Sequence, residues 1–147
     1  MSHRYVIDAN VLFSAFISGR ELYRLLFSEH TIYLPDFALL ELDKYKTRIL
    51  QKTRLDEREF QDFVLALFNH VTIVPRMVLS RGSIKRAFQL CKEVDEKDTM
   101  YVAVALELHV TLVTNDRVLY RGLKQRDFHR ITLLNDVVNA LPRIHLP

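Results

Sequence analysis

The sequence predicts one compact α/β domain in which a parallel β-sheet is packed between layers of helices. The first observation is an alternation: short β-branched-rich runs of four to six residues are separated by longer segments with helical spacing. This alternation is typical of βαβ units, in which a helix carries the chain back to start the next parallel strand. The second observation is that only three glycines and four prolines interrupt 147 residues, which favours dense regular structure with short loops.

Five runs are expected to form the sheet. The first, residues 4–8 (RYVID), is short and rich in β-branched side chains, and an aspartate ends it. The other four are residues 31–35 (TIYLP), 71–75 (VTIVP), 110–114 (VTLVT) and 130–135 (RITLLN). Runs of this length and composition are typical of strands.

Helices are expected between and after these strands. Asn10 can cap a first helix over residues 11–18, and Gly19 ends that helix. Pro35 is expected in the first turn of a long helix over residues 36–50. The remaining helices are expected at residues 21–30, 55–70, 80–94, 95–109, 117–125 and 136–141.

One of these helices carries a run of aromatic side chains. Phe60, Phe63, Val64, Leu67 and Phe68 recur at the spacing of a single helix face. A platform on which nucleobases stack is one interpretation, but this spacing favours a place in the core or in a helix–helix contact. The single cysteine, on the following helix, is expected to be a small buried hydrophobe rather than a nucleophile.

Composition excludes several classes of protein. Apolar residues make up 49% of the chain, charged residues 27%, and the mean hydropathy is zero, as in ordinary globular domains. The net charge of +3 and isoelectric point near 9.1 suit an anionic partner without requiring one. One cysteine, Cys91, excludes an intrachain disulfide and a multi-cysteine metal site. Without a visible signal peptide or a run of about 20 apolar residues, we expect a cytoplasmic protein with no membrane contact.

Acidic residues gather near the ends of the predicted strands. Asp8 ends the first strand, and Asp116 lies just past the fourth. Glu41 lies one turn inside the helix after the second strand, bracketed by leucines, and Asp95 and Asp98 open the helix before the fourth strand. Ligands of open α/β sheets bind in the crevice beyond the carboxyl ends of the strands. Acids from distant parts of the chain are therefore expected to converge there.

Each acid taken alone also has a structural explanation. Asp8 can form an Asx turn. Asp95 and Asp98 are first-turn acids of the kind that the helix dipole favours. Asn115 or Asp116 can cap the helix that follows.

Glu41 has a similar alternative, because an exposed glutamate can pair with Lys44 or Tyr45 one helical turn on. Taken together, however, the acids favour a metal site, since clustered carboxylates repel one another unless a cation lies among them. All-oxygen ligands suit Mg²⁺ or Mn²⁺ rather than zinc. The sequence contains no glycine-rich nucleotide motif, no H-E-x-x-H and no G-x-S-x-G, which disfavours the main alternative chemistries.

Basic residues cluster just beyond two of the acids. One cluster is Lys44, Lys46, Arg48, Lys52 and Arg54, and the other is Arg117, Arg121, Lys124, Arg126 and Arg130. A metal pocket rimmed by cations is what a phosphodiesterase needs, because the rim neutralises the phosphates beside the cut while the metal acts on the scissile one. Helices that simply carry solvated basic residues are the alternative.

Four segments share a family resemblance. YVIDANVLFSAF, PDFALLELDKY, DEKDTMYVAVALEL and LVTNDRVL, between about Tyr5 and Leu134, resemble in order and spacing the signature segments of PIN-domain proteins. These proteins include the ribonuclease toxins (VapC type) of toxin–antitoxin pairs. The resemblance implies a three-layer α/β/α sandwich with a mostly parallel central sheet and an inserted helical pair at about residues 36–69. It also implies a Mg²⁺- or Mn²⁺-dependent nuclease that acts on RNA.

The resemblance also assigns expected roles to individual residues. The acidic quartet looks like Asp8, Glu41, Asp98 and Asp116. Asn10 looks like the residue that orients Asp8 or a water on the metal, and Asp95 looks like a secondary acid near the site. Thr114 and Asn115 are expected to support the site by hydrogen bonding, although many family members have a small residue where Asn115 stands.

The expected mechanism combines these roles. The three aspartates of the quartet hold the cation directly or through water, and Glu41 positions or deprotonates the attacking water. The metal stabilises the charge that develops during in-line attack, and the resemblance implies products with a 5′-phosphate and a 3′-hydroxyl. The residues expected to bind RNA are Lys44, Arg48, Arg117, Arg121 and Lys124.

Other interpretations stay open at the level of sequence. The chain could be a toxin restrained by an antitoxin protein, a housekeeping RNA-processing nuclease, or a non-catalytic module that binds RNA or protein. A phosphohydrolase or receiver domain also has an acidic crevice, but IDAN and LLND fit a receiver poorly. The apolar segments LYRLLF and FVLALF can form either a homodimer interface, as the resemblance suggests, or part of the core.

Overall fold

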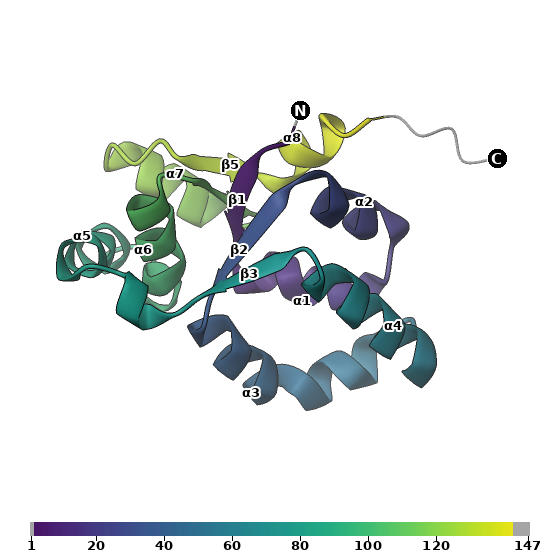
Figure 1. Ribbon diagram of the computed structural model, residues 1–147. Coiled ribbons are helices and arrows are strands. Elements are labelled where there is room, and N and C mark those ends of the chain that lie inside the picture. Colours follow the sequence, from purple (N-terminus) through teal and green to yellow (C-terminus); the bar gives the residue numbers. More distant parts are fainter. Residues whose placement is uncertain (1, 143–147) are drawn as a thin grey trace.

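The computed structural model describes residues 2–142, in which five strands form one parallel sheet (Figure 1). The strands are β1 (Arg4–Ile7), β2 (Thr31–Pro35), β3 (Val71–Val74), β4 (Thr111–Thr114) and β5 (Ile131–Leu133). The predicted fold class, a three-layer α/β/α sandwich, is confirmed. We predicted a single domain over residues 1–147, of which residue 1 and residues 143–147 lie outside the described part.

The order of the strands determines where a ligand can bind. The order is β3-β2-β1-β4-β5, so the chain moves outward from β1 to β3 and then crosses back to the other side of β1. β1 and β4 pair directly, with Tyr5 beside Thr111 and Ile7 beside Val113. Their carboxyl ends meet where the winding direction reverses, which in open α/β sheets is the usual ligand crevice.

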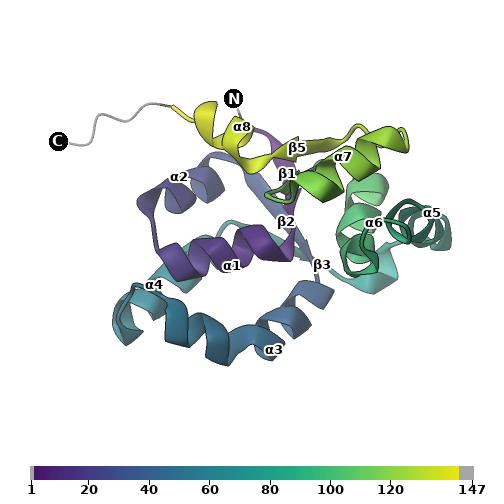
Figure 2. The same ribbon diagram turned by 180° about the vertical axis from the view of Figure 1, so that it is seen from behind.

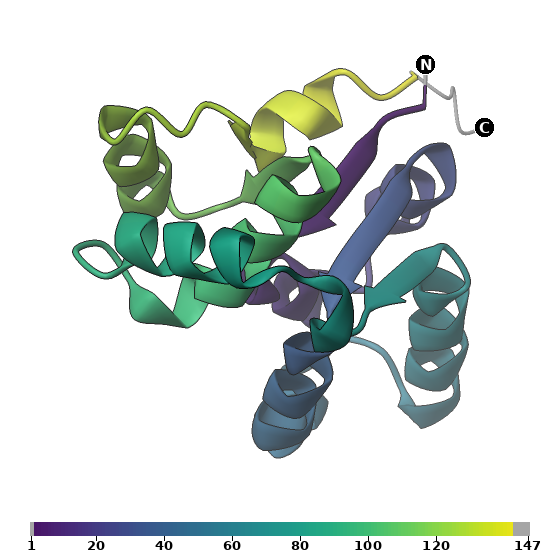
Figure 3. The same ribbon diagram turned by 60° about the vertical axis from the view of Figure 1, so that its left-hand side comes forward.

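Helices cover both faces of the sheet. The α-helices are α1 (Ala9–Ser18), α2 (Glu21–Glu29), α3 (Phe37–Lys52), α4 (Glu57–Phe68), α5 (Arg81–Cys91), α6 (Thr99–Leu108), α7 (Arg117–Gln125) and α8 (Leu134–Asn139), with 3₁₀ turns η1 (Arg76–Val78) and η2 (Glu96–Asp98). In Figure 3, α5 and α6 lie in front of the sheet and α1 lies behind it. Within residues 2–142 no helix has the length and apolarity needed to cross a membrane.

α3 and α4 form the helical pair that was predicted at about residues 36–69, inserted between β2 and β3. α1 and α3 contact each other, begin near the carboxyl edge of the sheet and run away from it in a similar direction (Figure 2). Both helices therefore begin beside the crevice described above.

The far ends of α1 and α3 are tied together. The Thr53 hydroxyl, just after α3, donates to the Phe16 carbonyl oxygen in α1 at 2.8 Å. Gly19 ends α1 with a φ of 61°, and a Cβ there would lie 2.6 Å from the Leu55 side chain. Any larger residue at position 19 would meet both a steric clash and an unfavourable backbone conformation. This corner keeps the two helices in place relative to each other.

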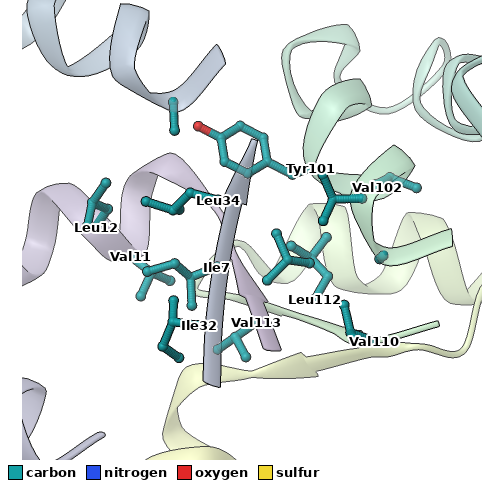
Figure 4. Packing of buried hydrophobic residues seen from close by; sticks show 14 of the residues in the cluster. Ile7, Val11, Leu12, Ile32, Leu34, Tyr101, Val102, Val110, Leu112 and Val113 are labelled. Carbon is teal, nitrogen blue, oxygen red and sulfur yellow. The ribbon is translucent and has the colours of Figure 1, made fainter. Parts of the chain in front are cut away.

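The core lies between the central strands and the helices that face them (Figure 4). Its most deeply buried members include Ile7, Val11, Leu12, Ile32, Leu34, Tyr101, Val102, Leu112 and Val113. Each such side chain contributes about 1.5–3 kcal/mol by leaving water. The crevice acids are therefore attached to the most stable part of the molecule.

The apolar face of α4 belongs to this core, as its spacing predicted. Phe63 and Leu67 are buried, and the rings of Phe60 and Phe68 pack at 6.1 and 6.2 Å from the ring of Phe16. The alternative of a base-stacking platform on α4 is therefore wrong for the phenylalanines that are buried here. Cys91 is also fully buried, as predicted.

Some local predictions were wrong. The N-cap of α1 is Asp8, whose side chain accepts a hydrogen bond from the Val11 N–H; Asn10 lies inside the first turn. The reason is that β1 ends at Ile7 and the chain enters the helix at once. Pro35 belongs to β2 rather than to the first turn of α3, because the next residue still bonds across to the Val74 carbonyl oxygen in β3.

The boundaries of two further elements also differ. The helix expected at residues 95–109 begins as η2, and α6 starts only at Thr99. The strand expected at residues 130–135 ends at Leu133, where α8 begins without a loop. Boundary residues depend on competing local hydrogen bonds, which periodicity does not report.

Candidate active site

The four acids of the predicted quartet lie around the carboxyl ends of β1 and β4. Asp8 follows β1, Asp116 lies two residues after β4, Asp98 ends η2, and Glu41 is on α3. Their charges act on one another. The pKa of Asp98 is raised to about 7, first by burial and then by the charges of Asp8, Asp95, Asp116 and Glu41. The fold thus brings together carboxylates from four separate segments of the chain.

Asp8 is the most deeply placed of these acids, with 2% of its surface exposed. One carboxylate oxygen accepts from the Val11 N–H at 3.0 Å, and the other accepts a short hydrogen bond from the Thr114 hydroxyl. Burial raises the pKa of Asp8 to about 6 although both hydrogen bonds oppose the shift, and the charges of Asp116 and Glu41 raise it further. Asp8 is thus a rigidly held carboxylate that ionises reluctantly without a nearby cation.

Thr114 joins the two sides of this edge. Its hydroxyl donates to Asp8 and accepts from the Asp116 backbone N–H at 3.0 Å. The Asp8 backbone N–H in turn donates to the Val113 carbonyl oxygen at 3.2 Å, so the pairing of β1 and β4 extends up to the site. Strand geometry therefore determines the position of both aspartates.

Asp116 and Asp95 also act as caps. One oxygen of Asp116 accepts from the Val118 and Leu119 N–H groups at the start of α7, at 2.9 and 3.1 Å. Asp95 accepts from the Lys97 N–H at 3.0 Å and caps η2. The structural explanations that the sequence allowed for these acids are therefore real, but they do not compete with membership of the cluster.

Glu41 is held by a residue that the sequence analysis missed. The Tyr101 hydroxyl, on α6, donates to a Glu41 carboxylate oxygen at 2.6 Å. Burial raises the pKa of Glu41, an effect that the Tyr101 hydrogen bond and the charges of Lys44 and Lys97 oppose. A tyrosine within the apolar run of α6 was the available signal, because a buried phenol needs a hydrogen-bond partner.

The surroundings of Glu41 differ from those expected. Leu39 and Leu40, which suggested an apolar setting, are 41% and 65% exposed and face away from the core. Glu41 is half-buried because it faces α6, not because leucines bracket it. Its hydrogen-bond partner is Tyr101 rather than Lys44 or Tyr45.

A cleft of about 500 Å³ opens beside the acids. It is lined by Ala9, Asn10, Phe13, Ser14 and Ile17 of α1, Glu41, Tyr45, Arg48, Ile49 and Lys52 of α3, Asp95, Lys97 and Asp98 around η2, and Asn115 after β4. The predicted supporting residues Asn10 and Asn115 thus face the cleft. Its size is typical of a small-ligand site and matches one or two nucleotides rather than a duplex.

The basic residues expected to bind RNA fall into two groups. Arg48 lines the cleft, and Lys44 lies close enough to act on the Glu41 carboxylate. Arg117, Arg121 and Lys124 are on α7 and do not line the cleft, because that helix leads away from Asp116 along the outside of the fold. Two cations of the cleft were not among the expected RNA contacts: Lys52, at the end of α3, and Lys97, in η2.

The donor chemistry of the cluster fits a hard divalent cation. Every candidate ligand is a carboxylate oxygen, the donor that Mg²⁺ and Mn²⁺ prefer. Within residues 2–142, no three acidic, histidine or cysteine side chains converge tightly enough in this conformation to chelate one ion. Mg²⁺ commonly binds through one or two carboxylates and keeps several waters. The raised pKa values of Asp8 and Asp98 are the electrostatic signature of carboxylates that a cation would stabilise.

Fold and site together define an open parallel α/β domain. Its carboxylates lie at the switch point, where the winding direction of the sheet reverses between β1 and β4. Comparison with known proteins identifies the family: a family model described as the PIN domain matches residues 6–135. The chain belongs to the PIN-domain family, whose members are generally nucleases that use divalent metal ions. No curated protein matches the chain.

Solved structures share the fold at low sequence identity. PAE2754 from Pyrobaculum aerophilum is similar at a TM-score of 0.60 and 14% identity, over 95% of this chain and 96% of that one. VapBC2 from Rickettsia felis, bound to a DNA fragment from its promoter, is similar at a TM-score of 0.52 and 19% identity, over 88% of this chain and 96% of that one. These likenesses support the same architecture.

Proposed function

We propose that this protein is a divalent-metal-dependent endoribonuclease that cleaves phosphodiester bonds of RNA. The observation that carries the proposal is the cluster of Asp8, Glu41, Asp98 and Asp116 at the switch point, next to a nucleotide-sized cleft that contains cations. Membership of a family that generally consists of nucleases supports it. Neighbouring carboxylates help to raise the pKa values of Asp8 and Asp98, a repulsion that a bound cation would relieve.

The side chains of the site have different proposed roles. Asp8, Asp98 and Asp116, with Glu41, would hold Mg²⁺ or Mn²⁺. The chemistry that such a cation supplies when bound is charge neutralisation at the phosphoryl oxygens and a lower pKa for water. Thr114 fixes the orientation of Asp8 through its hydroxyl. The remaining chain groups act on the substrate and on the attacking water.

Glu41 is the best-placed general base. Its carboxylate lines the cleft, and burial raises its pKa, which makes it a stronger acceptor for the proton of an attacking water. Tyr101 binds one of its oxygens at 2.6 Å, and the other oxygen would contact the cation or that water. Lys97 and Arg48, in the same cleft, neutralise the phosphates on either side of the attack.

We also propose that the protein is the toxin of a toxin–antitoxin pair. The support is its shared fold with VapBC2 from Rickettsia felis. A housekeeping role in RNA processing uses the same residues, and co-purification with the product of an adjacent gene distinguishes the two. An antitoxin would copurify with the toxin and suppress its activity.

A homodimer is the proposed assembly. Several apolar residues of LYRLLF and FVLALF, such as Leu26 and Phe63, are in the core, but Leu65 of FVLALF is 63% exposed. Leu65 and the exposed apolar residues Leu40 and Met77, which are 65% and 91% exposed, are candidates for a subunit contact. Light scattering of the purified protein tests this assembly.

The decisive experiment is cleavage of labelled single-stranded RNA with Mg²⁺, Mn²⁺ or EDTA. Asp116→Asn is the most informative variant, because asparagine caps a helix as well as aspartate does and only the charge is lost. Asp62→Asn, on the exposed side of α4, is the matched control. We expect cleavage to require metal, to disappear in Asp116→Asn and to persist in Asp62→Asn. Cleavage that continues in EDTA, or in Asp116→Asn, contradicts the proposal and favours a contaminating nuclease or a non-catalytic module.

A further inference from the structure

Gly122 lies in the middle of α7 although its backbone does not require glycine. Unlike Gly19, it has no positive φ. Glycine is among the least favourable residues in the interior of a helix, because the unfolded chain loses more conformational freedom there than at any other residue. A glycine that the backbone does not need indicates that a neighbouring segment uses the space of its missing side chain.

Val94, in the turn between α5 and η2, occupies that space. A Cβ at position 122 would lie 2.9 and 3.0 Å from the two γ carbons of Val94 and 3.6 Å from its Cβ. The first two distances are about 0.5–1 Å shorter than a normal contact between carbon atoms. Rotation of the side chain does not relieve both contacts, because two of the three staggered positions face Gly122 and two methyls must be placed. Alanine at position 122 therefore pushes Val94 away from α7.

The turn that carries Val94 yields more easily than α7 does. Leu119 and Leu123 of α7 are buried in the core, whereas Glu93 and Asp95, on either side of Val94, are exposed. Moving α7 would disturb close-packed core contacts, and moving the exposed turn would not. The displacement is therefore taken up by the segment between α5 and η2.

Hydrogen bonds connect this turn to Asp98. The Val94 and Asp95 N–H groups both donate to the Cys91 carbonyl oxygen, at 2.9 and 2.8 Å. The Asp95 carbonyl oxygen accepts from the Asp98 N–H at 3.2 Å, and the Asp95 side chain accepts from the Lys97 N–H at 3.0 Å. The segment therefore moves as one unit, and a shift of Val94 is passed on to Asp98.

The other side of the contact carries a second acid of the site. Asp116 is the N-cap of α7, and its carboxylate accepts from N–H groups in the first turn of that helix. The contact between Gly122 and Val94 thus joins the segment that holds Asp98 to the helix that Asp116 caps. Packing at this one point sets the spacing of the two segments.

We propose that Gly122 is a positioning residue of the site: its missing side chain lets the turn at Val94 pack against α7, and this contact sets the position of Asp98 relative to Asp116. The proposal rests on the nuclease function proposed above and adds a residue that does not itself line the cleft. Mg²⁺ demands a near-ideal arrangement of its ligands, and misplacement of a functional group by about 1 Å can cost about 100-fold in rate.

The test uses four matched variants. Gly122→Ala creates the clash, and its combination with Val94→Ala removes both γ carbons and leaves the ordinary contact at 3.6 Å. Val94→Ala alone is the reference for that double variant. Gly82→Ala is the control, because it makes the same change in α5, where a new Cβ has open space and the Ser80 hydroxyl oxygen is 3.9 Å away.

Two quantities are measured for each variant. Calorimetric titration gives the affinity of the protein for Mn²⁺ without RNA, and cleavage of single-stranded RNA is followed as a function of Mg²⁺ concentration. We expect Gly122→Ala to weaken Mn²⁺ binding by about 10–100-fold, as is typical when a residue that orients a metal ligand is changed. The Mg²⁺ concentration for half-maximal cleavage should rise by a similar factor.

The other variants should bind Mn²⁺ almost normally. The double variant is expected within about threefold of Val94→Ala, because the two substitutions affect one contact and are not additive. Gly82→Ala is expected within about twofold of the wild type, as for other surface substitutions. A purely structural role of Gly122 would change the melting temperature in EDTA and leave the Mn²⁺ affinity of the folded protein unchanged.

Wild-type Mn²⁺ affinity in a folded Gly122→Ala variant overturns the positioning role, and so does a loss that Val94→Ala does not reverse. If Gly122→Ala does not fold alone, the double variant decides, because weaker Mn²⁺ binding than in Val94→Ala then overturns the role. Loss and recovery of Mn²⁺ binding without any RNA cleavage by the wild type would retain the positioning role and contradict the nuclease. Metal-dependent cleavage with equal Mn²⁺ affinity in the wild type and Gly122→Ala would retain the nuclease and contradict the positioning role.

Discussion

The sheet edge and the α3 wall hold their carboxylates in different ways. At the sheet edge, Asp8 and Asp116 are linked through Thr114 and through backbone N–H groups of the strands and helices that they adjoin. On the α3 wall, Glu41 is anchored by one hydrogen bond to Tyr101, which lies 60 residues away in sequence. One region is positioned mainly by the backbone, the other by a single pair of side chains.

Substitutions in the two regions are therefore expected to affect stability and activity differently. Links at the sheet edge are part of the core, so breaking them affects both folding and function. The bond between Glu41 and Tyr101 lies between two helices that are already held in place by other contacts. Breaking it should change the site and leave most of the stability intact.

The largest expected effect is that of Asp8→Asn. The amide keeps an oxygen for the Val11 N–H but carries no charge, so we expect metal-dependent cleavage to fall by at least about 10³-fold. The amide nitrogen would replace the oxygen that accepts from the Thr114 hydroxyl, so the relief of a buried charge is offset by a lost hydrogen bond, and the melting temperature in EDTA should change little. Parallel activity assays and thermal melts measure both quantities, and a folded variant that retains activity would remove Asp8 from the site.

Thr114→Val should lower both activity and stability. It removes a donor to Asp8 and the acceptor of the Asp116 N–H. We expect activity to fall by about 10–100-fold and the free energy of unfolding to fall by about 1–3 kcal/mol. Thr132→Val, on β5, is the control that makes the same change away from the site. Urea unfolding measures the stability, and cleavage assays measure the activity. Normal activity in Thr114→Val would show that the hydrogen bonds of Thr114 to Asp8 and Asp116 are dispensable.

Tyr101→Phe should lower activity while it leaves most of the stability intact. The loss of one hydrogen bond should lower kcat by about tenfold, with little change in KM and about 1 kcal/mol of stability at most. The pH at which activity reaches half its maximum should shift, because the Tyr101 bond lowers the pKa of Glu41. Tyr33→Phe, which removes the acceptor of an Arg4 hydrogen bond, is the control. An unchanged pH profile in Tyr101→Phe would contradict a positioning role.

The last prediction concerns stability as a function of pH. Because the folded-state pKa of Asp8 is raised to about 6 and that of Asp98 to about 7, the folded protein binds these protons more tightly than the unfolded chain. Their contribution to stability is therefore full below pH of about 4 and is lost as pH rises through those two values.

Thermal melts between pH 4 and 8 in EDTA test whether stability falls as pH rises. The wild type should lose more stability over that range than a variant with both Asp8→Asn and Asp98→Asn. Saturating Mg²⁺ should flatten the wild-type slope, since a ligand that prefers the ionised folded state stabilises it. A wild-type slope equal to that of the double variant would contradict the raised pKa values of Asp8 and Asp98.

Much of the fold could be predicted from sequence, because its signals are local. The parallel sheet follows from short apolar runs that alternate with helices, and the α3–α4 pair follows from two helical stretches without a strand between them. Asp8 comes directly after an apolar run, which places it at the end of a strand. The cap of α1 could not be assigned correctly, since Asp8 and Asn10 are both good capping residues and the choice depends on where β1 ends.

The class of fold and the strand ends at which acids lie thus follow from the sequence alone. Three features depend on the folded arrangement: Tyr101 binds Glu41, Leu39 and Leu40 face away from the core, and the basic residues of α3 rather than those of α7 line the cleft. The physical reason is one of range. Periodicity and capping depend on neighbours within a few residues, whereas the direction of a helix face and the partner of a buried hydroxyl depend on segments that meet only when the chain has folded.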